Sequence, residues 1–393
     1  MLFQPLCEKS EMDVINHPLY VRPDKLQDFC IAILCSLGVS VEDATTTADV
    51  LVEADLQGID SHGVARLSYY VQNLTSGRVV AKPKIQKIWE TPTTATLDGG
   101  GGLGPPVSVK AMKLAITKAK KYFVGMVAVR NSNHYGIAGY YSALAIQEGM
   151  IGFSATNSLA LVVPTFGSKT MLGTNPLSLA VPGGKRGNFI LDMATSTVPI
   201  GKVEVFDRQG KEMPRGWATD EFGKVTVNPS MVLHNIYREQ YCGGGLLPLG
   251  GEGEETSGHK GYGLAVAVEI ISALLAGAAY SDLAYPRDAQ GKPLPAGIGH
   301  FFGALRIDGF RDPLAFAQDL DDLLDRLRRS PKATGRDRIF TAGEKESEIR
   351  LQRSRNGIPL HAKVHAELKK LAQELEIPAP LLSDGLPLPE KDR

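Results

Sequence analysis

The sequence has few cysteines, no net charge and no metal-binding cysteine pattern. Its four cysteines, at positions 7, 30, 35 and 242 of 393 residues, contain no CxxC pair, which argues against a disulfide framework or a zinc site. Free thiols in a reducing compartment are the expectation. The 43 basic and 43 acidic residues cancel, so neither nucleic acid nor an anionic membrane is expected as the main partner.

Long apolar runs and targeting signals are also missing. The start, MLFQPLCEKSEMD, lacks the basic segment and apolar core of a secretory leader. The longest apolar run, residues 262–280, is interrupted by Glu269 and Ser272. A membrane span needs about 20 mainly apolar residues without a central charge, so this run is interpreted as a buried helix. A cytoplasmic protein that does not cross a membrane is predicted.

What the sequence does contain is an alternation of helical and strand-like stretches around a strand-rich middle. Helical periodicity is expected over residues 24–37, 40–57, 61–74, 106–121, 261–277, 312–329 and 359–375. In the third helix Ser61 is the expected N-cap. Strands are expected over residues 93–99, 125–131, 151–157, 176–183, 188–195, 201–207 and 300–308. Because few strand–helix–strand units follow one another, the pattern indicates an α+β fold rather than a doubly wound parallel sheet.

Two glycine-rich stretches lie next to helices. GGGGLG at residues 99–104 satisfies GxGxxG, but no acidic residue ends the next strand, and a turn or substrate-facing loop is favoured over a Rossmann fingerprint. GGEGEETSGHKGYGL, residues 250–264, places His259 and Lys260 at the start of an apolar helix. The helix amides and the lysine charge suit a phosphate, although a simple connector fits the same pattern.

Several polar side chains suggest chemistry. DSHGVARL, residues 60–67, puts His62 and Arg66 one helical turn apart, opposite an apolar stripe. His134 lies in a loop after a strand, and Asp192 ends a strongly apolar strand, where it needs a partner. Oxidation of a 2-hydroxy acid needs an arginine for the carboxylate, a histidine for the proton and a nicotinamide for the hydride. These residues suit that reaction, but each also has an ordinary structural interpretation.

Six stretches occur in an order that resembles one enzyme family. They are DSHGVARL, NSNHYGIAGYYS, LGTNPLSLAVP, ILDMATS, GGLLPLGG and GHKGYGLAVAVEIISALLAG. The chain resembles the type-2 malate/L-lactate dehydrogenase family, which includes sulfolactate and ureidoglycolate dehydrogenases, over about residues 20–375. The resemblance implies a non-Rossmann NAD- or NADP-binding domain with a largely antiparallel sheet flanked by helices. It also implies a helix-rich domain from both chain ends and a homodimer.

The resemblance assigns roles to individual residues. Ser61 and Arg66 match substrate-contacting positions, and His62 or His134 matches the acid/base, with Asp192 supporting it or meeting the cofactor amide. The matching cofactor-lining positions are Ser158, Thr174, Asn175, Asp192, Met193, Ala194, His259, Lys260, Gly261 and, in a glycine–acid motif with Gly343, Glu344. Pro199 departs from the family pattern at a position that bears on cofactor choice.

The resulting prediction is an NAD(P)-dependent oxidoreductase acting on a small 2-hydroxy or 2-oxo acid of the malate, lactate or sulfolactate type. Two alternatives remain open: a reductase of cyclic imino acids on the same scaffold, and a nicotinamide-binding protein without turnover. Arg130, Lys185 and Arg186 are candidate contacts for a 2′-phosphate. The predicted domains are residues 20–118 packing with 303–376, a central NAD(P)-binding part over 119–302, and a loosely ordered tail over 377–393.

Overall fold

A computed structural model describes residues 19–237 and 241–379. Cys7 and most of the predicted tail, residues 380–393, therefore lie outside the described residues. The helices are α1 (Pro23–Ser36), α2 (Val41–Leu56), α3 (Leu67–Thr75), α4 (Gly104–Tyr122), α5 (Ala138–Ile146), α6 (Ile200–Arg208), α7 (Pro229–Tyr237), α8 (Gly258–Glu269), α9 (Pro313–Arg329), α10 (Glu344–Asn356) and α11 (Ala362–Glu374).

The strands form three sheets. They are β1 (Leu19–Val21), β2 (Gln86–Glu90), β3 (Thr94–Asp98), β4 (Val124–Ser132), β5 (Met150–Thr156), β6 (Leu177–Val181), β7 (Phe189–Met193), β8 (Ala218–Thr219), β9 (Val225–Thr226), β10 (Gly245–Leu246), β11 (Ile298–Arg306) and β12 (Ile358–Leu360). The large sheet has seven strands in the order β2-β3-β4-β11-β5-β6-β7, and β3 with β4 is its single parallel pair. The predicted α+β fold with a largely antiparallel sheet is confirmed.

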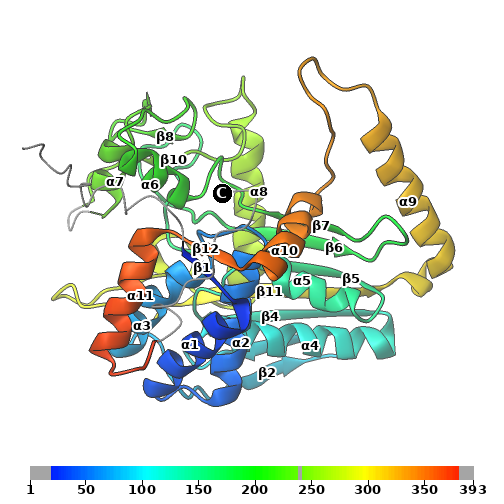
Figure 1. The fold of residues 1–393 in the computed structure, drawn as a ribbon, viewed down its shortest axis with the longest axis horizontal. Helices are drawn as coiled ribbons and strands as arrows, with labels where there is room; N and C mark the ends of the chain where they lie inside the picture. Colours follow the sequence, from blue (N-terminus) through cyan, green and yellow to red (C-terminus); the bar gives the residue numbers. More distant parts are fainter. Residues whose placement is uncertain (1–18, 238–240, 380–393) are drawn as a thin grey trace, which may run out of the picture.

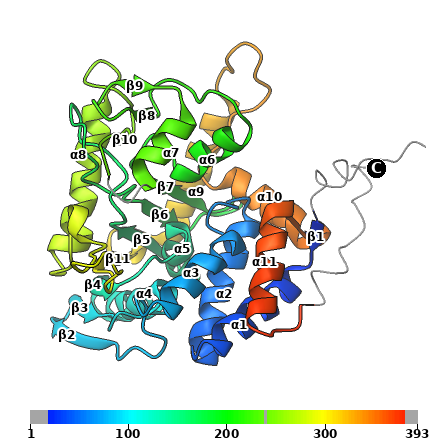
Figure 2. The ribbon, with the colours of Figure 1, turned by 90° about the vertical axis from the view of Figure 1, so that its left-hand side faces the viewer.

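The helices and sheets are arranged as Figure 1 shows, and three larger hydrophobic clusters among the described residues hold them together. One lies between the large sheet and the helices α4 and α5. A second joins α1, α2 and α3 to β12 and α11, so that the two ends of the chain share one core; Figure 2 shows these helices side by side. The third lies under α6, α7 and the small sheet β10-β8-β9. The domain boundaries proposed from the sequence remain predictions.

Two local predictions were wrong. Residues 201–207, GKVEVFD, form the helix α6 rather than a strand, because Ile200 and Val203 are buried three residues apart and pack into the third core. Ser61 is not an N-cap: a 3₁₀ turn, Val64–Arg66, precedes α3 and has no side-chain cap. By contrast Ser40 accepts a hydrogen bond from the Asp43 amide and caps α2 as an N-cap should.

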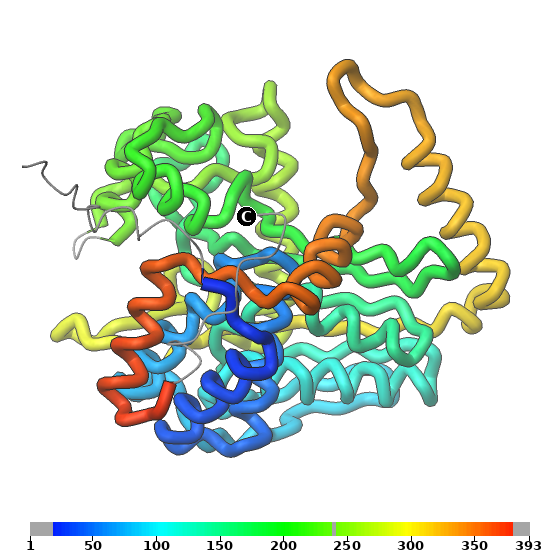
Figure 3. The backbone as a smooth tube through the Cα atoms, viewed as in Figure 1, coloured from blue at the N-terminus to red at the C-terminus, as the bar shows by residue number. Residues whose placement is uncertain are grey.

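α9 lies at the rim of the molecule. Figure 3 shows the chain running out along α9 and returning through an extended loop to α10. Asp321 of α9 accepts hydrogen bonds from the backbone amides of Lys185 and Arg186, and Asp325 pairs with the Arg186 guanidinium. The helix is thereby anchored at the β6–β7 hairpin, while Leu324 is its one buried residue.

Candidate active site

The glycine-rich turn at residues 99–104 supports the loop that carries His134. The amides of Gly99 and Gly101 donate to the carbonyl oxygens of Arg130 and Asn131, so they are already used within the fold. A Cβ on Gly104 would lie 2.3 Å from the His134 carbonyl oxygen. These glycines are therefore required for close backbone approach, and the turn is not a pyrophosphate cradle.

A buried carboxylate holds the turn that carries His62. Asp55 of α2 is 3 % exposed and accepts a hydrogen bond of 2.8 Å from the Val64 amide. A Cβ on Gly63 would lie 1.8 Å from Asp55 Oδ1, so only glycine fits there. Burial raises the pKa of Asp55 to about 8. Asp55 was not among the predicted site residues, although a carboxylate within an apolar helix was a usable signal.

The structure brings His62, His134 and Arg66 together. The rings of His62 and His134 stack with centroids 5.7 Å apart. Ser61 Oγ lies 2.9 Å from His62 Nδ1, and Arg66 Nε donates to the Ser61 carbonyl oxygen over 2.7 Å. The Arg66 charge acts on both imidazoles, because it contributes to the pKa shift of each.

The cluster combines a positive charge with two imidazoles of lowered pKa. Burial, assisted by the Arg66 charge, lowers the pKa of His62 to about 4. Burial also lowers the pKa of His134 well below its usual value, and the charges of His62 and Arg66 act in the same direction. No carboxylate among the described residues forms an ion pair with Arg66. An incoming carboxylate would therefore find an uncompensated cation beside two neutral imidazoles.

Asp192 lies on β7, an edge strand of the large sheet. Its Oδ2 accepts a 2.6 Å hydrogen bond from the Gly139 amide at the start of α5. Burial raises the pKa of Asp192 to about 6, with opposition from that amide and a further rise from Glu346. Within the described residues no hydrogen bond joins Asp192 to either histidine. The carboxylate instead faces a cavity of about 480 Å³ bounded by α2, α5, β7 and the start of α10.

The predicted cofactor-lining residues form a second, connected group. The Thr174 amide donates to Ser158 Oγ over 3.1 Å, and Thr195, which follows Met193 and Ala194, donates its hydroxyl to the Thr174 carbonyl oxygen. The Leu249 amide in turn donates to the Thr195 carbonyl oxygen. A Cβ on Gly261 would lie 2.0 Å from the carbonyl oxygen of Leu249, so the first turn of α8 is in backbone contact with this group.

Asn175 shows an unsatisfied polar atom in the same group. Its Nδ2 donates to Glu269 Oε2 over 2.6 Å and to the Ala265 carbonyl oxygen, whereas its Oδ1 is buried without a partner. A Cβ on the neighbouring Gly173 would lie 2.3 Å from Ser158 Oγ and 2.6 Å from Asn175 Oδ1. A buried acceptor without a donor and a glycine that leaves the approach open together fit a hydrogen-bonding ligand.

Two further parts of the predicted set have hydrogen-bond partners within the chain. His259 and Lys260 are exposed, but their backbone amides donate to Gly253 and Ser257, so those two amides are not free for a phosphate. Glu344 is occupied by its own chain: Arg328, Arg338 and the Thr341 amide bind its carboxylate and lower its pKa to about 2 against the effect of burial. Glu269, noted in the sequence as an interruption of an apolar run, emerges as the anchor of Asn175.

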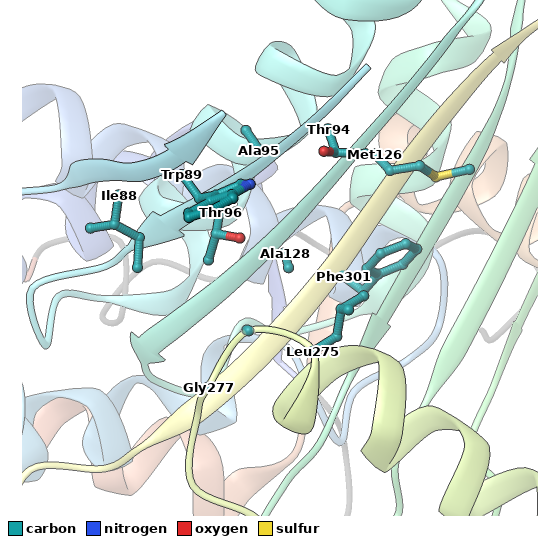
Figure 4. Close-up of a pocket in the computed structure, with 11 residues that line it drawn as sticks. Ile88, Trp89, Thr94, Ala95, Thr96, Met126, Ala128, Leu275, Gly277 and Phe301 are labelled. Atoms are coloured by element: carbon teal, nitrogen blue, oxygen red, sulfur yellow. The ribbon is translucent and has the colours of Figure 1, made fainter. Parts of the chain in front are cut away.

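A separate cavity of about 620 Å³ lies on the sheet face away from α4 (Figure 4). Trp89, Met126, Leu275 and Phe301 line it, together with small residues of β3 and β4. It contains none of the predicted site residues, and its lining offers no titratable side chain for catalysis.

Both the sequence and the fold of this chain are similar to those of known proteins. Residues 21–369 match the family model described as malate/L-lactate dehydrogenase. This chain belongs to the malate/L-lactate dehydrogenase family. The malate dehydrogenase of Pyrococcus abyssi is 45 % identical over 360 residues, covering 91 % of this chain and 96 % of the relative. The L-sulfolactate dehydrogenase of Methanocaldococcus jannaschii is 38 % identical over 360 residues, covering 91 % and 97 %.

A solved structure extends the family likeness to the fold. The malate dehydrogenase of Entamoeba histolytica superimposes with a TM-score of 0.87 at 38 % identity, covering 92 % of this chain and 99 % of the other. The resemblance stated from six sequence stretches is thus confirmed. None of the helices within residues 19–237 and 241–379 combines the length and hydropathy that a membrane span requires.

Proposed function

We propose that this protein is an NAD(P)-dependent dehydrogenase that interconverts a small 2-hydroxy acid and its 2-oxo acid, with malate as the first candidate substrate. The observation that carries the proposal is the cluster of His62, His134 and the unpaired Arg66. The names of the relatives at 45 % and 38 % identity favour malate and sulfolactate over lactate.

Arg66 binds the substrate carboxylate through its guanidinium, whose Nη atoms remain available because Nε is used by the Ser61 carbonyl oxygen. Neutralising that charge removes a cause of the low pKa of both imidazoles. Binding of the substrate therefore raises the basicity of the group that must take the hydroxyl proton. The unbound site keeps both imidazoles neutral, the state that an acid/base group needs before it accepts a proton.

A nicotinamide dinucleotide supplies the hydride acceptor when it is bound. The unsatisfied Asn175 Oδ1 and the open approach at Gly173 fit such a group, with Ser158, Thr174 and the first turn of α8 beside them. Asp192 is well placed to accept a hydrogen bond from a ligand amide, because a buried carboxylate with one amide donor retains acceptor capacity. Glu344 holds the start of α10 in place beside the cavity that Asp192 lines.

Two of the candidate cations for a 2′-phosphate already have partners within the chain. Arg130 pairs with Asp98, and Arg186 pairs with Asp325, so neither guanidinium is free for a 2′-phosphate. We keep both cofactors in the proposal. The cytoplasmic location remains a prediction from the sequence.

A homodimer is the second part of the proposal. Apolar side chains on and before α9 are exposed in the single chain: Phe310 is 76 %, Leu314 75 %, Leu323 52 % and Leu327 48 % exposed. A helix at the rim with this much apolar surface is typical of a subunit interface. A second copy of the chain is the occupant that the family resemblance implies.

Initial rates test the catalytic proposal. The full chain is assayed with NAD⁺ and with NADP⁺ against malate, lactate, sulfolactate and ureidoglycolate, following formation of reduced nicotinamide. We expect turnover with malate or sulfolactate and a clear preference for one cofactor. Binding of the cofactor without turnover of any hydroxy acid, or turnover confined to reduction of a cyclic imine, would refute the proposal.

A further inference from the structure

Two groups lie within hydrogen-bond distance of the same ring nitrogen of His134. Tyr70 Oη lies 3.0 Å from His134 Nδ1, and the Gly136 amide points its N–H at the same atom over 3.4 Å. Tyr70 is 1 % exposed, so water does not compete for its hydroxyl. Within the described residues, the Nε2 atom of His134 has no hydrogen-bond partner, and neither does the Nε2 atom of His62.

Tyr70 and Gly136 differ in the hydrogen bonds that they can form with His134. The Tyr70 hydroxyl can rotate, since the His134 carbonyl oxygen is a second acceptor at 3.3 Å. The Gly136 amide has no such freedom, because a backbone N–H always donates and points in one direction. A proton on His134 Nδ1 would face the amide hydrogen. Neutral His134 therefore keeps its lone pair on Nδ1 and its proton on Nε2.

Packing holds Gly136 and the His134 ring in this geometry. Gly136 has a φ of +82°, and a Cβ there would lie 2.5 Å from Val50 Cγ1, so both conformation and space require glycine. The rings of Tyr69 and His62 both pack near the His134 ring, at centroid distances of 6.0 Å and 5.7 Å. Turning the imidazole over would leave both donors facing a carbon atom.

His62 has a different kind of partner. Its Nδ1 lies 2.9 Å from Ser61 Oγ, and a serine hydroxyl both donates and accepts. His62 can therefore hold a proton on either nitrogen without losing that hydrogen bond. Of the two imidazoles, His62 is the one that can present an unprotonated Nε2 and then become doubly protonated.

We propose that Tyr70 and Gly136 are positioning residues that fix the proton of His134 on Nε2. His134 is thereby a hydrogen-bond donor, and His62 is the group that accepts the substrate proton. This inference rests on the proposed function. In hydroxy-acid oxidation the substrate O–H bond breaks and its proton passes to His62 Nε2. The C–H electron pair leaves as hydride to the oxidised nicotinamide, and a C=O bond forms. His134 donates an Nε2–H hydrogen bond to the reacting oxygen and keeps its proton throughout.

Nitrogen NMR of the full chain tests the tautomer without reference to turnover. The chain is labelled with ¹⁵N-histidine, and the His134 signals are identified by their loss in His134→Gln. At neutral pH we expect His134 Nδ1 to show the shift of an unprotonated ring nitrogen and Nε2 that of a protonated one. A protonated Nδ1 would overturn the inference, whatever the enzyme's substrate.

Two phenylalanine variants test the role of Tyr70. Tyr70→Phe should raise the population of His134 protonated on Nδ1 and lower kcat about fivefold with little change in KM. Tyr69→Phe is the matched control, because its hydroxyl contacts Tyr285 and not His134. We expect it to keep the wild-type tautomer. An unchanged tautomer in Tyr70→Phe would show that Tyr70 has no positioning role.

Glutamine variants test the division of work. Glutamine can donate a hydrogen bond but cannot take the substrate proton at neutral pH. His62→Gln should therefore lower kcat by about a thousandfold, and His134→Gln by about tenfold to a hundredfold. The reverse order would overturn the assignment. A wild-type enzyme inactive on every hydroxy acid would refute the proposed function, while the NMR result for His134 would stand.

Discussion

Among the described residues, the Arg66 guanidinium supplies the positive charge beside His62 and His134, and removing it should affect binding of the substrate more than any other single change. Arg66→Ala is expected to raise KM for the hydroxy acid and to lower kcat/KM by about a hundredfold, since charged hydrogen bonds contribute about 1.5–3 kcal/mol. Saturation kinetics with the preferred cofactor measure this effect.

Substitution of Arg66 by lysine is the control that keeps the positive charge but removes the two-pronged hydrogen bonding. Arg66→Lys should fall between the wild type and Arg66→Ala, because an ammonium group neutralises the carboxylate but does not bind it bidentately. The cofactor KM should stay unchanged in both variants. Wild-type kinetics in Arg66→Ala would remove Arg66 from the site.

Asp55 should make stability depend on pH. Its pKa is about 8 in the folded chain and about 4 when unfolded, so the folded state binds one more proton between these values. Stability then falls as pH rises through this window, by up to about 1.4 kcal/mol per pH unit. The nearby charges are Asp60, which raises the pKa of Asp55, and Arg353, which lowers it.

Asp55→Asn removes this titration and keeps an oxygen for the Val64 amide. Its midpoint of urea unfolding should change less than that of the wild type between pH 5 and pH 8. At pH 8 the variant should be at least as stable as the wild type. If the two proteins show parallel pH profiles, Asp55 is not protonated in the folded state.

At the level of single residues, the sequence identified the candidate site residues that lie within recognisable motifs. His62, His134 and Arg66 were named and lie together. Gly136 was not named, because its role depends on the direction of a backbone N–H two residues after His134. Tyr70 was not named, because its role depends on a contact between α3 and a loop 64 residues further along the chain. Such a contact has no signature in local periodicity.

At the scale of elements, the first turn of α8 connects the glycine-rich loop to the predicted cofactor residues. Gly261→Ala would place a Cβ 2.0 Å from the Leu249 carbonyl oxygen. The turn must shift, and overpacking of this kind costs about 1–3 kcal/mol. We expect the Kd of the nicotinamide cofactor to rise about tenfold, as measured by fluorescence titration.

Gly263→Ala is the matched control in the same helix. A Cβ at this position meets nothing within 4 Å. Alanine is a better helix former than glycine by about 0.5–1 kcal/mol, so this variant should have a raised Tm and an unchanged cofactor Kd. Equal cofactor affinity in both variants would separate α8 from the cofactor site.

Element prediction succeeded where one face of a helix or strand is buried and failed where tertiary packing decides. The strands β4, β5, β6, β7 and β11 were predicted within a few residues, as were α1, α2, α4 and α9. The segment GKVEVFD alternates like a strand, yet Val203 and Ile200 are buried with helical spacing. α10 was missed because none of its residues is buried, so it has no apolar stripe.

On the scale of the whole molecule, α9 should decide the oligomeric state. Leu323→Glu combined with Leu327→Glu places two charges on one exposed apolar face of α9, because the two positions are four residues apart. Burying a charge without a partner is unfavourable, so the double variant should shift the protein from dimer to monomer in light scattering. Gln318→Glu, an exposed change of charge on the same helix, should leave the mass unchanged. A wild-type protein that is monomeric at micromolar concentration would contradict the proposed dimer.

The arrangement of the whole chain explains why the site forms between distant segments. Residues 60–66 come from the helical core that joins both chain ends, whereas His134 and Asp192 belong to the large sheet and its connections. In the sequence, only the family resemblance indicated that these segments lie close together in space. Their approach depends on the glycine turn at residues 99–104 and on Asp55, neither of which periodicity could place in space.

The most direct test of the central claim is a single-turnover experiment in which excess enzyme is mixed with its preferred oxidised nicotinamide cofactor and malate or sulfolactate. Formation of reduced nicotinamide is followed by absorbance for the wild type and for Arg66→Ala at the same saturating cofactor concentration. The account predicts stoichiometric hydride transfer in the wild type and a rate about a hundredfold lower in the variant at subsaturating substrate. Equal rates in the two proteins, or no hydride transfer in a folded wild type that binds the cofactor, would contradict it.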